Sequence, residues 1–179
     1  MITSPLAICS DEPYPQLQNL GSASLYFDEI LSIERVKLFE DFSNEEIEAL
    51  CRYMMCYAAP SGCRLLQEGD EEDFLLLILT GKVSVIKQME SEGSRSITVA
   101  EPGMSLGEMS LIDGSTRFAS CDAIIPTDFA VLSRASLNAI FVQMPRLGNK
   151  LLLVLLKLMT TRLRDTSVLS FPKMTEVYV

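Results

Sequence analysis

The chain has 179 residues, 48% of them hydrophobic, and a formal net charge of −9 without a single histidine. This length predicts one domain with a packed core, and the hydrophobic content is too high for a disordered chain. The acidic balance argues against nonspecific nucleic-acid binding, and the missing histidine excludes histidine-ligated haem or zinc and histidine general-base catalysis.

Residues 1–22 are predicted to form a flexible N-terminal arm, because three prolines interrupt any regular helix there. The segment has neither the basic start nor the apolar stretch of a signal peptide. Five cysteines, an odd number, favour free thiols in a reducing compartment, so we expect a cytoplasmic protein. The spacing of Cys51, Cys56 and Cys63 matches no strong iron–sulfur motif, and no metal site is predicted.

Two helices are predicted ahead of the first strand. The apolar pattern of residues 23–36 is compatible with a short amphipathic helix. Ser43 is followed three residues later by Glu46, the spacing of a capping box, and Ile47 and Leu50 then recur at helical intervals. A second helix is therefore expected to begin at Ser43.

Short apolar or alternating segments, separated by glycine-containing turns, occupy the centre of the chain. A polar stretch with a glycine at residues 89–95 predicts a hairpin tip. Several short strands at close and even spacing are typical of a mainly β fold, a sandwich or jelly roll. The expected strands are residues 63–70, 74–79, 82–87, 96–100, 120–125 and 128–132.

Two further helices are expected near the C-terminus. Ser133 is a suitable N-cap for residues 134–144, and Pro145 ends that segment. A longer helix is predicted at about residues 147–166, followed by a tail at residues 170–179. Its apolar run from residue 151 to 156 is too short to span a membrane. Because the run is continuous, it places apolar side chains on every face of the helix. Either the helix is fully buried, or it has two contact faces, one on the barrel and one on a partner's equivalent helix.

The segment from Leu106 to Ser120 carries the side chains that suggest a binding site. Gly107 allows a close backbone approach, Glu108 follows it, and Arg117 comes nine residues after Glu108. A carboxylate accepts a hydrogen bond from a ribose hydroxyl, and a guanidinium pairs with phosphate through a forked, charged contact. The combination suits a ligand that joins a ribose hydroxyl to an anionic phosphate.

This segment resembles the phosphate-binding cassette of cyclic nucleotide-binding domains, the family of bacterial catabolite-activator regulators and protein kinase A regulatory subunits. The turns at Gly69 and Gly81 also fall where the family's barrel places them, so the resemblance covers roughly residues 36–165. It implies a double-stranded β-helix (jelly roll) with N-terminal helices and a long C-terminal helix, together forming a domain of residues 23–169. The ligand-binding residues that it implies are Leu106, Gly107, Glu108, Met109, Ser110, Arg117, Phe118 and Ala119.

Two positions depart from the family pattern. Phe118 stands where alanine, serine or threonine is usual, and Thr116 replaces a proline. A phenyl ring in the pocket would crowd the phosphate or stack on the base, whereas a ring in the core would leave binding unaffected. In relatives the long helix contacts the purine, and Thr160, Thr161 and Arg162 lie near the corresponding distance along it. No residue distinguishes cAMP from cGMP.

We interpret the chain as a cyclic nucleotide sensor that signals through its C-terminal helix to a partner protein. The nucleotide is its expected ligand, and no other cofactor is expected. Family members dimerise through the corresponding helix, which predicts a homodimer. Only twelve residues follow Ser167, too few for a helix-turn-helix, so this chain alone is not expected to bind DNA.

Three other interpretations remain open. In the first, the chain is a degenerate module that binds no nucleotide and serves dimerisation or interaction. In the second, it is a fragment of a transcription regulator without its helix-turn-helix. The third, an enzyme of the similar cupin type, would use clustered histidines and a glutamate to hold a metal. Because the chain contains no histidine, we expect that it is not an enzyme.

Overall fold

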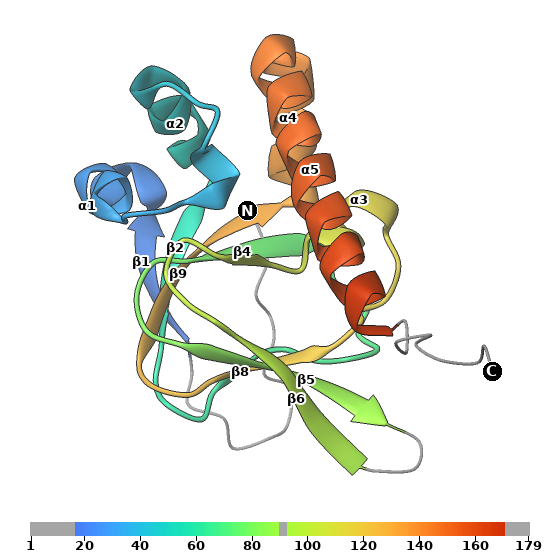
Figure 1. The fold of residues 1–179 in the computed structure, drawn as a ribbon. Coiled ribbons are helices and arrows are strands. Elements are labelled where there is room, and N and C mark those ends of the chain that lie inside the picture. The colour runs from blue at the N-terminus through green and yellow to red at the C-terminus, as the bar shows by residue number, and fades with distance from the viewer. Residues whose placement is uncertain (1–16, 90–92, 171–179) are drawn as a thin grey trace, which may run out of the picture.

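Two antiparallel sheets face each other in a jelly roll, and helices cover the outer face of the larger sheet (Figure 1). This computed structural model describes residues 17–89 and 93–170, with side chains as far as residue 165. Among the helices so described, none has the length and apolar character of a bilayer span. The mainly β fold with flanking helices agrees with the sequence prediction.

The larger sheet has the strand order β1-β2-β9-β4-β7, and the smaller sheet has the order β3-β8-β5-β6. The strands are β1 (Gln18–Ser22), β2 (Met55–Ala59), β3 (Arg64–Leu66), β4 (Phe74–Ile78), β5 (Val83–Met89), β6 (Gly93–Ala100), β7 (Ser105–Leu106), β8 (Ser120–Ala123) and β9 (Thr127–Ser133). The helices are η1 (Ala23–Tyr26), α1 (Phe27–Ser32), η2 (Lys37–Phe39), α2 (Asn44–Cys51), α3 (Glu108–Asp113), α4 (Arg134–Gln143) and α5 (Pro145–Ser170).

The N-terminal prediction was wrong at its inner boundary. Residues 18–22 form β1 rather than the end of a flexible arm, because β1 pairs with β2 from Gln18 opposite Ala58 to Ser22 opposite Met55. This pairing joins segments more than 30 residues apart, so no local sequence pattern predicts it. Residues 1–16 of the expected arm and 171–179 of the expected tail lie outside the described residues.

The helices ahead of the barrel follow the prediction only in part. The expected helix at 23–36 is divided into η1 and α1, which ends at Ser32. The capping box of α2 is confirmed: the Ser43 hydroxyl accepts from the Glu46 N–H at 3.3 Å, and Glu46 Oε2 accepts from the Ser43 N–H at 2.8 Å. The hairpin tip is shorter than predicted, since β6 begins at Gly93, and residues 90–92 lie outside the described part.

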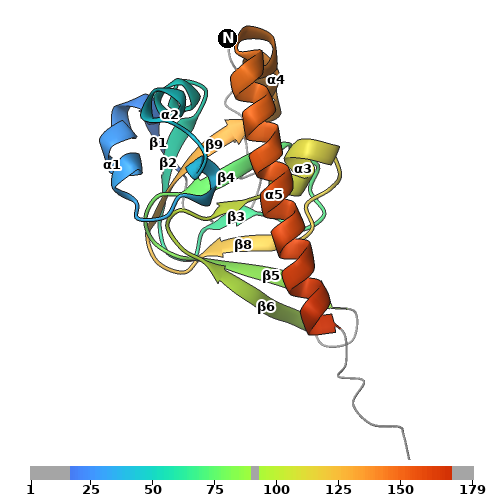
Figure 2. The same cartoon turned by 45° about the horizontal axis from the view of Figure 1, so that its top comes forward.

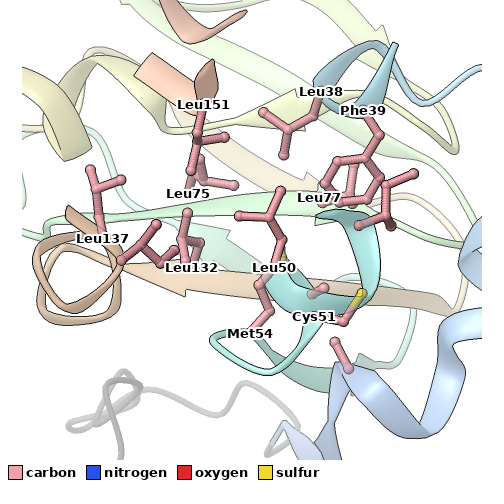
Figure 3. Packing of buried hydrophobic residues seen from close by; sticks show 14 of the residues in the cluster. Leu38, Phe39, Leu50, Cys51, Met54, Leu75, Leu77, Leu132, Leu137 and Leu151 are labelled. Atoms are coloured by element: carbon pink, nitrogen blue, oxygen red, sulfur yellow. The ribbon is translucent and has the colours of Figure 1, made fainter. Parts of the chain in front are cut away.

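Strand β4 separates two hydrophobic clusters, which explains its unbroken apolar sequence. Leu75 and Leu77 face the helices, whereas Phe74, Leu76 and Ile78 face the smaller sheet. Successive side chains of a strand point to opposite faces, so a strand that is buried on both sides has no polar position. Figure 3 shows the helix-side cluster, in which Leu75 and Leu77 meet side chains of η2, α2 and α5.

Helix α5 crosses the molecule from α4 past α3 toward the far end of the smaller sheet (Figure 2). It begins at Pro145, two residues earlier than predicted, because proline is well suited to the first turn of a helix. Leu151 and Leu155 are fully buried, but Leu153 and Leu163 on other faces are 60% and 67% exposed. The fully buried alternative is therefore wrong.

Candidate functional site

The turn between β7 and α3 is built around Gly107. Its φ of +84° lies in the left-handed region that favours glycine. A Cβ at this position would lie 2.6 Å from Arg117 Nη1 and 2.9 Å from the carbonyl oxygen of Phe74. Any side chain here would therefore displace Arg117 or strain the backbone, so the glycine is required by both its conformation and its surroundings.

The Arg117 guanidinium lies inside the domain, and the residue is only 2% exposed. It stacks over the Phe74 ring at 4.4 Å, and Nη1 donates to the carbonyl oxygens of Phe74 at 2.8 Å and Gly107 at 3.2 Å. Its Nε and Nη2 atoms are buried and have no hydrogen-bond partner among the described residues. The nearest opposite charge is Glu72 Oε2, 3.6 Å from Nε, which is too long for a hydrogen bond.

Burial shapes the electrostatics of this pair. It lowers the pKa of Arg117 from its usual value, although Glu72 opposes that shift. It likewise raises the pKa of Glu72, with Arg117 opposing. Because the pKa of an arginine is normally above 12, the guanidinium stays charged at neutral pH. A buried cation with two unused donors is a costly arrangement that an anion with two acceptor oxygens would relieve.

Glu108, the first residue of α3, is also only 2% exposed. Its Oε1 accepts from the Ser105 hydroxyl, and its Oε2 accepts from Arg162 Nη1 at 2.8 Å. Arg162 also donates through Nη2 to the Ser105 carbonyl oxygen at 2.5 Å. Helix α5 therefore reaches across the turn and holds the carboxylate that the sequence assigns to the ligand.

The other expected site residues divide into buried and exposed positions. Leu106, Ser110 and Ala119 are buried, and the Ser110 carbonyl oxygen accepts from Arg134 Nη2 at 2.7 Å. Met109 is half exposed on the outer side of α3.

Phe118 is 57% exposed, so its ring is not in the core. The Lys87 ammonium lies 4.4 Å from the ring centroid and donates to the Phe118 carbonyl oxygen at 2.7 Å. The side chain that departs from the family pattern is thus held at the surface by a cation–π contact.

Sequence reasoning missed Ser105 and Glu72 as neighbours of the site. The three-residue interval from Ser105 to Glu108 could have suggested their contact, but the ion pair between Glu72 and Arg117 joins separate turns and leaves no local signal. Of the three residues weighed for base contacts, only Arg162 reaches the site. Thr160 and Thr161 line an open groove of about 630 Å³ between α5 and Asp41.

Four of the cysteines lie among the described residues. Cys51, Cys56, Cys63 and Cys121 are buried and not joined in disulfides, and no cluster of three or more histidine, cysteine or acidic side chains suited to a metal occurs among the described residues.

The fold and this geometry define a class: a jelly-roll module whose buried guanidinium and carboxylate suit a ligand with an anionic and a hydroxyl group. The sequence model described as "Cyclic nucleotide-binding domain" matches residues 58–144. A solved cyclic nucleotide-binding domain from Methylobacillus flagellatus KT is 52% identical, with a TM-score of 0.81 over 94% of this chain and 96% of that chain. The chain belongs to the cyclic nucleotide-binding domain family, a regulatory rather than catalytic class.

More distant relatives are longer regulators. The cyclic AMP receptor protein of Thermus thermophilus is 28% identical over 134 residues, which are 75% of this chain and 62% of the relative. The solved catabolite activator protein of the same species is 29% identical, with a TM-score of 0.66 over 74% of this chain and 60% of that chain. The chain thus spans about 60% of the length of the curated regulators that it matches.

Proposed function

We propose that this domain is a sensor that binds a cyclic nucleotide, cAMP or cGMP, at the turn between β7 and α3. One observation carries the proposal: Arg117 is buried with two unused donors, and it donates to the carbonyl oxygen of Gly107, the residue that precedes the buried Glu108. A cyclic phosphate offers two exocyclic oxygens to such a guanidinium, and the adjoining ribose offers a hydroxyl to such a carboxylate. The matches to a cyclic AMP receptor and to a cyclic nucleotide-binding domain support this ligand class.

Each residue has a definite role in this proposal. Arg117 neutralises the phosphate, Glu108 accepts from the ribose 2′-hydroxyl, and Gly107 leaves room for both. Leu106, Met109, Ser110, Phe118 and Ala119 complete the binding segment through their backbone. The N–H groups in the first turn of α3 lack intrahelical acceptors and add donors for the phosphate. The nucleotide is the domain's ligand, and the proposal needs no metal or other cofactor.

We further propose that α5 carries the signal and forms a homodimer. Leu153, Leu156, Thr160 and Leu163 are exposed along α5 at alternating intervals of three and four residues, the spacing of a coiled-coil seam. Large apolar side chains at three of these four positions favour burial against a partner helix. An effector protein would then respond to a change in α5. The buried thiols, which form no disulfide among the described residues, support a reducing compartment such as the cytoplasm.

A second candidate is a nucleotide-free interaction module. It is favoured by one observation: Arg117 and Glu108 are each 2% exposed and have partners within the domain. On that account the two residues stabilise the turn and never meet a ligand.

Isothermal titration of the purified protein with cAMP, cGMP and a cyclic dinucleotide separates the two candidates. The protein must first be freed of copurified nucleotide by unfolding and refolding, and 5′-AMP serves as the matched control without a cyclic phosphate. The sensor predicts saturable binding of one cyclic mononucleotide in preference to 5′-AMP. If the folded protein gives no binding heat and no thermal shift with any of these nucleotides, the result would support the interaction module instead.

A further inference from the structure

Glu72 places a second carboxylate beside the guanidinium of Arg117. It lies in the turn that precedes β4, and its side chain is 17% exposed. Its Oε2 is 3.6 Å from Arg117 Nε, and both atoms are buried without a hydrogen-bond partner among the described residues. The carboxylate therefore meets the guanidinium from the side of Nε.

That side is the one that a phosphate would use. The Nη1 atom of Arg117 already donates to the carbonyl oxygens of Phe74 and Gly107. The remaining donors, Nε and Nη2, form the edge of a guanidinium that pairs with two oxygens of one phosphate or carboxylate. Because Nε carries a single hydrogen, it cannot serve Glu72 and a phosphate equally well.

The two anions would also repel each other. A phosphate on this edge brings its negative charge to within about 4–6 Å of the Glu72 carboxylate, a separation at which one negative charge disfavours the other. The repulsion is relieved when Glu72 takes up a proton from solvent. The neutral carboxyl group no longer competes for Nε, and its O–H can donate to a phosphate oxygen.

We infer that Glu72 is a specificity-determining residue of the site: its carboxylate shares one edge of Arg117 with the phosphate, so that an anionic ligand binds together with a proton. The inference rests on the proposed function and adds the dependence of that same site on pH. The cyclic phosphate itself remains a monoanion over the neutral range, so the proton goes to the protein.

The groups around Glu72 favour this uptake. Burial raises the pKa of Glu72 from its usual value, Arg117 opposes the shift, and Asp70 adds to it. Cys121 also lies near Arg117, but burial raises the pKa of its thiol to about 12, so the thiol stays neutral. Asp73 acts on Arg117 from an exposed position.

The composition of the chain makes the effect easy to assign. The chain contains no histidine. Binding that depends on pH between about 5.5 and 7.5 would therefore point to a carboxyl group with a raised pKa.

The sign of the effect follows from the repulsion. A bound phosphate raises the pKa of Glu72 further, so the affinity is highest where Glu72 is already protonated and falls as the pH rises. Wild type is expected to bind cAMP about 10-fold more tightly at about pH 5.5 than at about pH 7.5. Glu72→Gln keeps the shape and removes the charge. It should bind about 10-fold more tightly than wild type at about pH 7.5 and change less than about 2-fold over the range.

Glu71→Gln is the matched control, because Glu71 is the exposed neighbour of Glu72 in the same turn. It corrects for the general effect of removing one negative charge. The three proteins are titrated with cAMP by calorimetry at both pH values. Wild type and Glu72→Gln are also titrated at an intermediate pH in two buffers of different ionisation enthalpy, which counts the protons taken up. Wild type should take up a proton on binding, and Glu72→Gln should take up none.

The outcomes separate this inference from the proposed function. Proton uptake by wild type, with tighter binding by Glu72→Gln than by Glu71→Gln, supports both. If wild type binds cAMP without proton uptake and the two variants bind alike, the inference fails and the sensor stands. Weaker binding by a folded Glu72→Gln would show that the carboxylate assists the ligand, which also overturns the inference. If none of the three proteins binds cAMP or cGMP at either pH, both fail.

Discussion

The Gly107 backbone and the Arg117 guanidinium occupy adjoining space, so that a Cβ added to the glycine would lie 2.6 Å from Nη1 of the arginine. Nη1 also donates to the Gly107 carbonyl oxygen at 3.2 Å. The bend that precedes Glu108 and the position of the buried cation are therefore set by the same contact. A change at either residue moves both halves of the candidate site.

Gly107→Ala should destabilise the domain by about 2–4 kcal/mol, since it adds a steric clash to the strain of a left-handed backbone. Gly62→Ala is the matched control, because Gly62 has a φ of +81° but nothing lies within 4 Å of its added Cβ. That control should cost only about 1 kcal/mol. Urea unfolding of the two variants measures the difference, and equal losses would show that Arg117 moves aside freely.

Arg117→Lys should weaken cyclic nucleotide binding about 100-fold, because a lysine keeps the charge but loses the forked pair of donors. Stability should fall by about 1–2 kcal/mol, since the buried hydrogen bonds from Nη1 to the Phe74 and Gly107 carbonyl oxygens are disturbed. Arg52→Lys, at an exposed ion pair with Glu48, is the control and should leave affinity unchanged. Titration calorimetry and thermal unfolding report the two effects. If Arg117→Lys binds the nucleotide with wild-type affinity, the arginine does not pair with the phosphate.

The sequence predicted best those features that are local. The capping box of Ser43 and Glu46, the helix start at Ser133 and the apolar strand β4 each depend on neighbours within a few residues, and each is confirmed. Strands β1 and β2 were missed because they are defined by pairing with distant segments. Their sequences lack the alternation that marks a half-buried strand.

The candidate site shows the same division. The turn at Gly107 and the short helix from Glu108 follow from the sequence, and burial of Arg117 beside them agrees with a role inside the domain. The bond from Arg162 to Glu108 spans 54 residues and depends on how α5 crosses the turn. Sequence spacing placed Arg162 near the base of the nucleotide and did not indicate a contact with the carboxylate.

Leu163→Glu should convert a homodimer to a monomer, because it places a charge in the exposed apolar seam of α5. Val142→Glu on α4 is the control, since Val142 is at least as exposed but lies outside the seam. Sedimentation velocity at several concentrations measures the oligomeric state. Dimers that persist in Leu163→Glu would place the interface elsewhere, and a monomeric wild type would remove the proposed dimer altogether.

The buried thiols should resist modification in the folded protein. Burial raises the pKa of Cys51 to about 11 and of Cys56 and Cys121 to about 12. At pH 8 fewer than about 1 in 1,000 of these thiols is the reactive thiolate. A Cys9→Ser variant, which removes the cysteine outside the described residues, should react with a thiol reagent at least about 100-fold more slowly when folded than in urea. Rapid labelling of the folded variant would contradict this burial.

The same shifts predict a loss of stability at alkaline pH. For a thiol whose pKa is raised in the folded state, the full contribution to the free energy of unfolding is present below its unfolded pKa of about 8.5. The contribution is then lost as the pH rises from there toward 11–12. Urea unfolding between pH 7 and 10.5 should show declining stability above about pH 9, less steeply in Cys51→Ala than in the wild type. Parallel curves for the two proteins would rule out this cause.

The central claim, that Glu108 accepts from a ribose hydroxyl while Arg117 holds the phosphate, is tested most directly by a thermodynamic cycle. The affinities of cAMP and 2′-deoxy-cAMP are measured for the wild type and for Glu108→Gln. We predict that the wild type prefers cAMP by about 10-fold and that Glu108→Gln reduces this preference to about 2-fold. An equal preference in both proteins, or no binding of either nucleotide by the wild type, would contradict the claim.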